Sequence, residues 1–229
     1  MTLLVDIFVT ILYFLLFALI HSFTASKSLK YAVALSFPGF MPWYRLAYNA
    51  LSLITLYIFY SNSPKNGYTL YDLPTPVDLI FASIQFGSVI GLSWTFKSIS
   101  GKEFMGISQA LRGIKNDYKP LEDLDEKYSL RIEGPYKFSR HPIYLFSTIF
   151  LLFRPQMHLD YLIMTILFIA YFYIGSIFEE KKLIQQFGDE YLQYQKSTGR
   201  IFPRLRKRVQ ADRNSIPRKR SDNRPDCPA

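Results

Sequence analysis

Two polar segments flank an apolar stretch in the C-terminal half of the chain. The first, GPYKFSRHPIY, contains an arginine, a histidine, two prolines and two tyrosines, and the second, FEEKKLIQQFG, contains the pair Glu179 and Glu180. A carboxylate that faces the inside of a helix bundle could bind a cationic or hydroxyl-rich ligand, and His141 is the nearby group that titrates near neutrality. Since acidic residues at membrane depth are costly and usually functional, both segments are candidates for a binding or catalytic site.

The same residues also have a simpler interpretation. Glu179 and Glu180 could be interfacial charges that mark where a helix leaves the bilayer, and Tyr136 and Tyr144 could be aromatic-belt residues. Adjacent positions of a helix point about 100° apart, so the two carboxylates are not expected to face the same neighbour.

The histidines and the cysteine limit other chemistry. His21 and His158 lie at the ends of apolar runs, where contact with lipid headgroups is the expected role, and the same reading is open for His141. The three histidines are scattered without a carboxylate in helical register, so no metal site is expected. Cys227 is the single cysteine, which excludes disulfides within the chain and thiolate metal clusters.

Long apolar runs define the class of protein that has to position these residues. Of the 229 residues, 49% are hydrophobic, and four runs of 18–20 residues carry at most one charge each. A hydrocarbon core about 30 Å thick needs about 20 helical residues. We therefore predict an all-α, polytopic membrane helix bundle with about five transmembrane helices. The predicted spans are 3–20, 43–60, 77–96, 142–154 and 161–178.

The fourth predicted span is short. Its apolar part, 143–153, would reach about 17 Å as a helix, which is about half of the hydrocarbon core. Pro142 suits a first helical turn, so we interpret 142–178 as a C-terminal helical hairpin whose first arm is short, tilted or packed against other helices. The segment EEKKLIQQFG continues the second arm, with Gly188 as its C-cap, and DEYLQYQKSTG forms a further short helix.

Basic residues predict the orientation of the chain in the membrane. Lys and Arg number three in 21–45, one in 61–76 and nine in 97–141, with Arg154 alone at the hairpin tip. Cytoplasmic loops are rich in Lys and Arg, so the N-terminus is predicted outside and the C-terminus in the cytoplasm. The polar segments then lie where a soluble cofactor and a membrane-dissolved substrate could meet.

The tail 204–229 holds nine basic residues, three aspartates and almost no large apolar side chains. We expect a disordered cytoplasmic tail that favours the acidic headgroups of membrane lipids, and no nucleic-acid partner.

The order of the motifs resembles the C-terminal half of the isoprenylcysteine carboxyl methyltransferase and phospholipid methyltransferase superfamily. The pattern there is G-x-Y-x-x-x-R-H-P-x-Y, followed after a hydrophobic hairpin by E-E-x-x-L-x-x-x-F-G-x-x-Y-x-x-Y. The match covers about 70 residues of this chain. Its fixed positions are Gly134, Tyr136, Arg140, His141, Pro142, Tyr144, Glu179, Glu180, Leu183, Phe187, Gly188, Tyr191 and Tyr194.

The N-terminal half adds a narrower resemblance. HSFTASKSLK after the first span, YRLAYNALSLITL in the second and FMGISQ after the third are similar to segments of the NnrU-like membrane proteins. Those proteins include bacterial enzymes that methylate small thiols such as methanethiol. The resemblance implies a single membrane methyltransferase domain over residues 1–203, and a prokaryotic cell membrane rather than the endoplasmic reticulum.

The superfamily resemblance implies S-adenosylmethionine as the methyl donor, held by the loop before the hairpin and the helix after it. The implied cofactor-binding residues are Gln109, Tyr128, Ser129, Leu130, Arg131, Tyr136, His141, Pro142, Ile143, Tyr144, Glu179 and Glu180. The implied catalytic residues are His141 and Arg200. A carboxylate can bind the donor's ammonium or ribose diol, and tyrosine rings can face its sulfonium. Methyl transfer itself needs little more than alignment and a dry site.

One position departs from the isoprenylcysteine enzymes. In those enzymes an arginine one helical turn before the paired glutamates holds the substrate carboxylate, and here that position is Gly175. The departure favours an uncharged small or lipophilic acceptor that enters from the bilayer, such as a thiol, with a phospholipid amine as a close rival. Arg200 is the late arginine that could replace the missing cation if the acceptor is a carboxylate.

Two other functions stay open at this stage. An NADPH-dependent membrane reductase of the sterol-reductase type shares similar H-P and E-E-x-x-L signatures. A non-enzymatic NnrU-like membrane protein could keep the fold for assembly or sensing.

Overall fold

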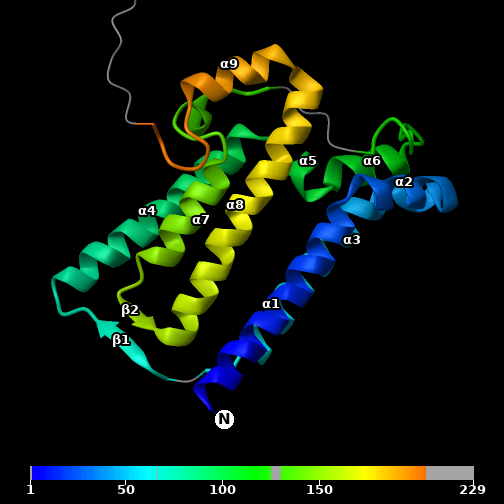
Figure 1. The fold of residues 1–229 in the computed structure, drawn as a ribbon. Coiled ribbons are helices and arrows are strands. Elements are labelled where there is room, and N and C mark those ends of the chain that lie inside the picture. Colours follow the sequence, from blue (N-terminus) through cyan, green and yellow to red (C-terminus); the bar gives the residue numbers. More distant parts are fainter. Residues whose placement is uncertain (1, 66, 125–129, 205–229) are drawn as a thin grey trace, which may run out of the picture.

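The computed structural model describes residues 2–65, 67–124 and 130–204, and their secondary structure is mostly helical (Figure 1). The helices and strands are α1 (Leu3–Ala25), α2 (Lys27–Ser36), η1 (Pro38–Phe40), α3 (Met41–Asn62), β1 (Thr69–Asp72), α4 (Val77–Ser98), α5 (Gly101–Met105), α6 (Ile107–Ile114), η2 (Gly134–Lys137), α7 (Pro142–Leu152), β2 (Gln156–His158), α8 (Leu159–Phe187) and α9 (Asp189–Ser197).

Each of the five predicted spans falls on one of these helices, namely α1, α3, α4, α7 and α8. Within the described ranges, three helices are long and apolar enough to cross a membrane: α1, α4 and α8. Helix α3 has 22 residues but carries more polar side chains, and α7 has only 11. The predicted class, a helical membrane bundle, is confirmed, while the number of spans stays a prediction.

One short pair of strands, which the sequence did not predict, accompanies the helices of the all-α bundle. Strands β1 and β2 pair antiparallel, with Tyr71 opposite Met157 and Asp72 opposite Gln156. They join the loop after α3 to the turn between α7 and α8. Strands of three and four residues are too short to show the alternation of apolar and polar side chains that identifies a strand in a sequence.

Helix α7 is the short first arm of the hairpin and packs against α4 and α8 (Figure 1). It begins at Pro142, as expected, because proline tolerates the first turn of a helix. The ring of Phe146 from α7 packs directly on α4 at Gly91, where an added Cβ would lie 2.3 Å from that ring. The short arm is therefore held by neighbouring helices.

An aromatic core joins α1, α3 and α8. Phe14, Phe17 and Phe59 are buried, and the ring of Phe168 from α8 meets Phe14 edge to face with centroids 5.2 Å apart. Edge-to-face aromatic pairs add to the free energy gained by burying apolar surface. This core fixes the N-terminal helix pair against the helix that carries Glu179 and Glu180.

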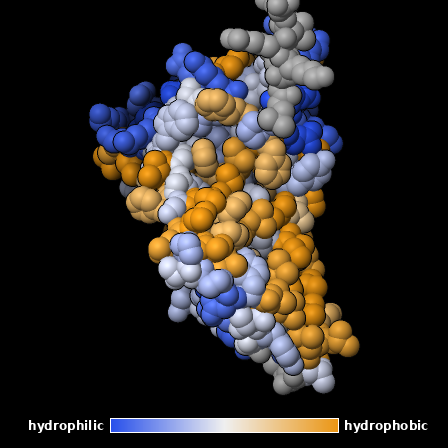
Figure 2. Space-filling view, turned by 90° about the vertical axis from the view of Figure 1, so that its left-hand side faces the viewer, coloured by the Kyte–Doolittle hydropathy of each residue, from blue (hydrophilic) through white to orange (hydrophobic). Residues whose placement is uncertain are grey.

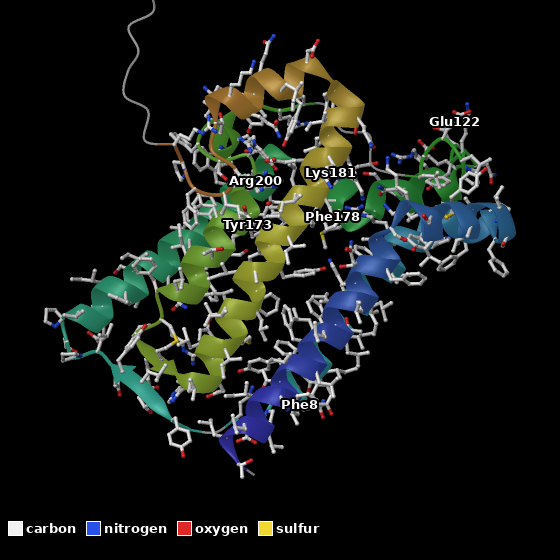
Figure 3. All side chains as sticks on the ribbon, viewed as in Figure 1. Phe8, Glu122, Tyr173, Phe178, Lys181 and Arg200 are labelled. Atoms are coloured by element: carbon white, nitrogen blue, oxygen red, sulfur yellow. The ribbon has the colours of Figure 1, made fainter. Side chains whose placement is uncertain are left out.

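The long helices also present apolar side chains outward. Phe8 on α1 is 65% exposed and points away from the bundle (Figure 3). In the space-filling view, hydrophobic residues cover much of the middle of the face shown, and hydrophilic residues gather toward its upper end (Figure 2). Large apolar surfaces of this kind mark contact with a membrane or a partner, and here they fit contact with lipid acyl chains.

Helix α8 extends nine residues beyond its predicted span and ends at Phe187. Gly188 follows with φ +55°, a conformation that favours glycine, and α9 then runs from Asp189 to Ser197. The predicted helical continuation and short final helix are confirmed. The turn at Gly188 brings the chain back toward the start of α7 (Figure 1).

Candidate active site

A buried carboxylate organises the end of the hairpin. Both oxygens of Glu180 accept hydrogen bonds: Oε1 from Arg140 Nε at 2.7 Å, and Oε2 from Gln195 Nε2 at 3.0 Å and Arg200 Nε at 3.2 Å. The side chains of Glu180 and Arg140 are only 4% and 6% exposed. We call Arg140, His141, Glu180, Gln195 and Arg200 the Glu180 cluster.

Backbone pairing brings the members of this cluster together. Arg140 N donates to Gly199 O at 2.9 Å and His141 N donates to Arg200 O at 3.0 Å, so the segment before α7 runs beside the segment after α9. A Cβ at Gly199 would lie 1.9 Å from Phe202 O, so only glycine fits the tight turn that follows this pairing. Arg140 Nη1 also donates to Gln195 O at 3.1 Å. The arginine therefore ties three parts of the chain that are distant in sequence.

His141 lies between the two glutamates. Its Nδ1 is 3.0 Å from Glu179 Oε2, and its Nε2 is 3.4 Å from Glu180 Oε1 but makes no well-aligned hydrogen bond. The expectation that the two carboxylates would not face one neighbour is wrong, because the imidazole is wide enough to reach both. Burial lowers the pKa of His141, but the hydrogen bonds and charges of Glu179 and Glu180 outweigh it and leave the pKa above its ordinary value.

The two glutamates differ sharply in exposure. The side chain of Glu179 is 52% exposed, compared with 4% for Glu180. Beside Glu179, the rings of His141, Tyr144 and Phe172 form a stack, with successive centroids 5.4 and 5.1 Å apart. Burial, and second the Glu179 carboxylate, raises the pKa of Tyr136 to about 12. Glu179 is thus an accessible carboxylate at the edge of an aromatic wall.

Most of the predicted site residues meet at this end of the hairpin. Arg200 lies over the ring of Tyr173 at 5.6 Å, with both side chains directed to the same side of α8 (Figure 3). The carbonyl of Tyr136 accepts a hydrogen bond from Tyr194 Oη at 2.5 Å. The residues of this region that the sequence predicted are Tyr136, His141, Pro142, Ile143, Tyr144, Glu179, Glu180 and Arg200. Their role in binding a cofactor stays a prediction.

The other predicted positions are placed differently. Gln109 lies on α6, which packs on α3, and its Nε2 donates to Glu103 O at 3.2 Å. Arg131 donates to Ser98 O at the end of α4, and Leu130 precedes it in the same connection. Tyr128 and Ser129 lie outside the described residues.

Several residues of the site were missed by sequence reasoning. Arg140 was noted only as part of the R-H-P motif, although a buried carboxylate requires a cation, and that requirement could have identified it. His21 was expected to contact headgroups, but its ring bonds to Ser52 and Tyr48 of α3. Tyr48 and Ser52 lie one helical turn apart, so the sequence places them on one face of a helix, but it does not identify their partner on α1.

His158 lies at the opposite end of the long helices. Its Nδ1 is 3.3 Å from Thr69 Oγ1 across the β1–β2 pair. It lines a cavity of about 260 Å³ together with Lys65 and Arg154. This cavity is remote from Glu179, since almost the whole length of α8 separates them.

Comparison with known proteins identifies the family. The chain is 30% identical over 212 residues to methanethiol S-methyltransferase of Pseudomonas deceptionensis, an alignment that covers 87% of this chain and 73% of that protein. It is 29% identical over 221 residues to methanethiol S-methyltransferase 2 of Bradyrhizobium diazoefficiens, with 93% and 79% covered. No family model and no solved structure matches. At this similarity over most of both chains, the chain belongs to the methanethiol S-methyltransferase family.

Proposed function

We propose that this protein is an S-adenosylmethionine-dependent membrane methyltransferase whose acceptor is a small uncharged thiol. One observation carries the proposal: the half-exposed Glu179 lies 3.0 Å from His141 and beside the stacked ring of Tyr144, next to a fully paired buried carboxylate. The family to which the chain belongs supports the reaction type. The donor and the acceptor are inferred from the chemistry of the site.

The residues at Glu179 fit the chemical groups of this donor. Glu179 can accept hydrogen bonds from an ammonium or a ribose diol, and the imidazolium of His141 can face a carboxylate. The rings of Tyr136 and Tyr144 can lie against a sulfonium. When bound, the donor supplies an electrophilic methyl group. Glu180 has both oxygens engaged, so its proposed role is to hold Arg140 and Arg200 in place.

The acceptor is inferred from a missing cation. Gly175 lies one helical turn before Glu179, and a Cβ there would lie 3.5 Å from Tyr144 Oη, so a tyrosine hydroxyl occupies the region that an arginine would need. Arg200 is paired with Glu180 and is therefore not available as the partner of a substrate carboxylate. A neutral thiol needs no such partner. A phospholipid amine meets the same condition and is the rival acceptor.

The proposed arrangement in the membrane follows from the same elements. Helix α8 has the β1–β2 pair at one end and Glu179 near the other, so the site lies at one membrane surface. The basic segments 97–141 and 204–229 make this the cytoplasmic surface, with five spans and the N-terminus outside. Residues 1–203 then form the methyltransferase domain and 204–229 a basic tail.

A competition assay tests this function. Protein purified in detergent receives S-adenosylmethionine labelled in the methyl group, together with methanethiol, phosphatidylethanolamine and a prenylcysteine analogue. We expect the label mainly in dimethyl sulfide. Label mainly in the prenylcysteine ester would overturn the inference from Gly175, and label in the lipid would make the amine the acceptor. Calorimetric titration with NADPH in parallel tests the reductase alternative, for which binding of NADPH but not of S-adenosylmethionine is the signature.

A further inference from the structure

A second polar cluster lies inside the N-terminal half of the bundle. His21 on α1 bonds to two residues of α3: its Nδ1 is 2.9 Å from Ser52 Oγ and its Nε2 is 2.8 Å from Tyr48 Oη. We call His21, Tyr48 and Ser52 the His21 cluster. Nothing in the Glu180 cluster requires it, and a titratable ring held among apolar helices is costly unless it serves a purpose.

Contacts with the turn between α5 and α6 fix the position of α3, the helix that carries Tyr48 and Ser52. Arg45 Nε and Asn49 Nδ2, on the same helix as Tyr48, donate to Phe104 O at 3.1 and 3.3 Å. A Cβ at Gly106, where φ is +90°, would lie 2.8 Å from Leu46 N, so the turn after α5 packs directly on α3. The three N-terminal motifs singled out in the sequence therefore converge on the helix that presents Tyr48.

The hydrogen bonds determine which nitrogen of His21 is basic. Ser52 Oγ donates its proton to Tyr48 O at 2.8 Å, so toward His21 it can only accept, and Nδ1 must carry the hydrogen. Nε2 is then the acceptor, and the Tyr48 hydroxyl donates to it. The hydrogen bonds therefore run in one direction, from Tyr48 Oη to His21 Nε2. The Tyr48 oxygen can still accept a hydrogen bond from another group.

The His21 cluster lies close to the proposed methyl-transfer site. Tyr144, whose ring is stacked on His141 beside Glu179, packs on Phe172 of α8 with ring centroids 5.1 Å apart. The Tyr171 ring also lies 6.1 Å from the His21 ring, and its hydroxyl is 2.9 Å from Ser22 Oγ. The His21 cluster and the aromatic wall beside Glu179 therefore contact adjacent residues of α8, Tyr171 and Phe172.

We propose that Tyr48 contacts the acceptor thiol and that His21 receives its proton through Tyr48. The inference rests on the proposed function and assigns the acceptor side of that site. The acceptor sulfur forms a bond to the methyl carbon while the bond from that carbon to the donor's sulfonium sulfur breaks, which leaves a neutral thioether. The thiol proton passes to Tyr48 Oη as the Tyr48 proton passes to His21 Nε2. The products are the methyl thioether, the demethylated donor and a protonated His21.

The ring of His21 is surrounded by polar groups from two neighbouring helices. The titratable and polar groups that face its ring are Tyr48 and Ser52 from α3 and Tyr171 from α8. Proton transfer of this kind contributes about 10² to 10⁴ in rate.

The experiment compares two thiols of similar size and different acidity, ethanethiol and 2,2,2-trifluoroethanethiol, with Tyr48→Phe and His21→Gln. The control is Tyr44→Phe, which removes another phenol of α3 that bonds to α1, from Tyr44 Oη to Thr24 O at 2.7 Å. We expect both site variants to lose about 10²-fold in kcat/KM for ethanethiol. The loss should be much smaller for the acidic thiol, which reacts as a thiolate without a base. The control should match the wild type.

Donor affinity by calorimetry provides a readout that does not depend on turnover, and it should be unchanged in both variants. Equal losses for the two thiols, or no loss in either variant, would overturn the roles of Tyr48 and His21 and leave the proposed function standing. A wild-type protein that methylates neither thiol would overturn the proposed function instead. If one variant does not bind the donor, the other decides, because each removes a different member of the same chain.

Discussion

The Glu180 cluster and the His21 cluster both contact helix α8, but the first is centred on a buried charge and the second is half-buried and contains no ion pair among the described residues. In the first, two arginines and a glutamine converge on one carboxylate whose two oxygens are both occupied. In the second, the His21 ring bonds to a phenol and to a hydroxyl, and the phenol oxygen of Tyr48 keeps a lone pair that can accept a further hydrogen bond. One cluster is a closed set of ion pairs, and the other is a short chain with an open end.

This difference suggests a structural role for the Glu180 cluster and a role in proton transfer for the His21 cluster. A charge can remain buried only if its pairing is complete, so the Glu180 cluster has little capacity to bind a further ligand and much capacity to fix the chain around it. A neutral histidine bonded to a phenol can gain a proton without losing its partners. Substitutions should therefore affect folding most in the first cluster and turnover most in the second.

The largest effect is expected for Arg140→Met. Among the described residues, this change leaves the buried Glu180 carboxylate with hydrogen bonds from Arg200 and Gln195, and it frees the carbonyls of Gln195 and Thr198. Removal of one partner of a buried ion pair lowers the free energy of unfolding by about 3–5 kcal/mol. Equilibrium unfolding in detergent should show a loss of this size.

The matched control is Lys119→Met, which breaks the solvent-exposed ion pair of Lys119 with Glu122. No measurable change is expected there, because water and salt screen exposed pairs. Equal stability of the two variants would contradict the view that the Glu180 cluster holds the fold together.

The next largest effect is expected for Glu179→Gln, and in binding rather than in folding. Loss of one charge-assisted hydrogen bond of about 1.5–3 kcal/mol weakens donor binding about 10- to 150-fold. The half-exposed side chain contributes little to stability, so the unfolding transition should stay close to that of the wild type. Calorimetric titration with S-adenosylmethionine measures the first quantity. Glu122→Gln is the control, and unchanged donor affinity in Glu179→Gln would reject this residue as a donor ligand.

The sequence predicted the helices better than it predicted the site. The apolar runs and Pro142 located α1, α3, α4, α7 and α8, because runs of that length have few alternatives to a helix. Strands β1 and β2 were missed, since their pairing depends on two loops that meet only in the folded chain. Local pattern determines a helix, whereas a strand of three residues depends on its partner.

Within the site, the sequence identified the motif residues but not the different environments of Glu179 and Glu180. The sequence presents Glu179 and Glu180 as equivalent neighbours, and only the fold shows that one is buried by Arg140 and Arg200 and the other remains accessible. The contact of His21 with Tyr48 joins residues 27 apart and could be inferred only from the packing of α1 on α3. Long-range contacts of this kind leave no periodic signal.

A smaller effect is expected from pH. The pKa of His141 is raised in the folded protein, so its contribution to stability is fully present below the ordinary histidine pKa of about 6.5 and is lost as the pH rises through the raised value. The free energy of unfolding should therefore fall from pH 6.5 toward alkaline pH. In His141→Gln this part of the fall should disappear. A variant with the same pH dependence as the wild type would show that another group causes it.

The smallest effect is expected from truncation, and it defines where the Glu180 cluster ends. The last described contact of this region is from Arg204 Nη1 to Lys196 O at 2.9 Å, so a chain that ends at residue 204 keeps every donor to Glu180. Residues 205–229 have the composition of a basic tail with almost no large apolar side chains, and their removal should leave donor affinity and unfolding unchanged. A chain that ends at residue 197 is the control, because it lacks Arg200 and also Gly199, whose carbonyl accepts from Arg140 N. The shorter chain should lose donor binding and stability together. If removal of 205–229 alone abolishes donor binding, the donor site extends beyond the Glu180 cluster. The part of the chain that the site needs would then end later than residue 204.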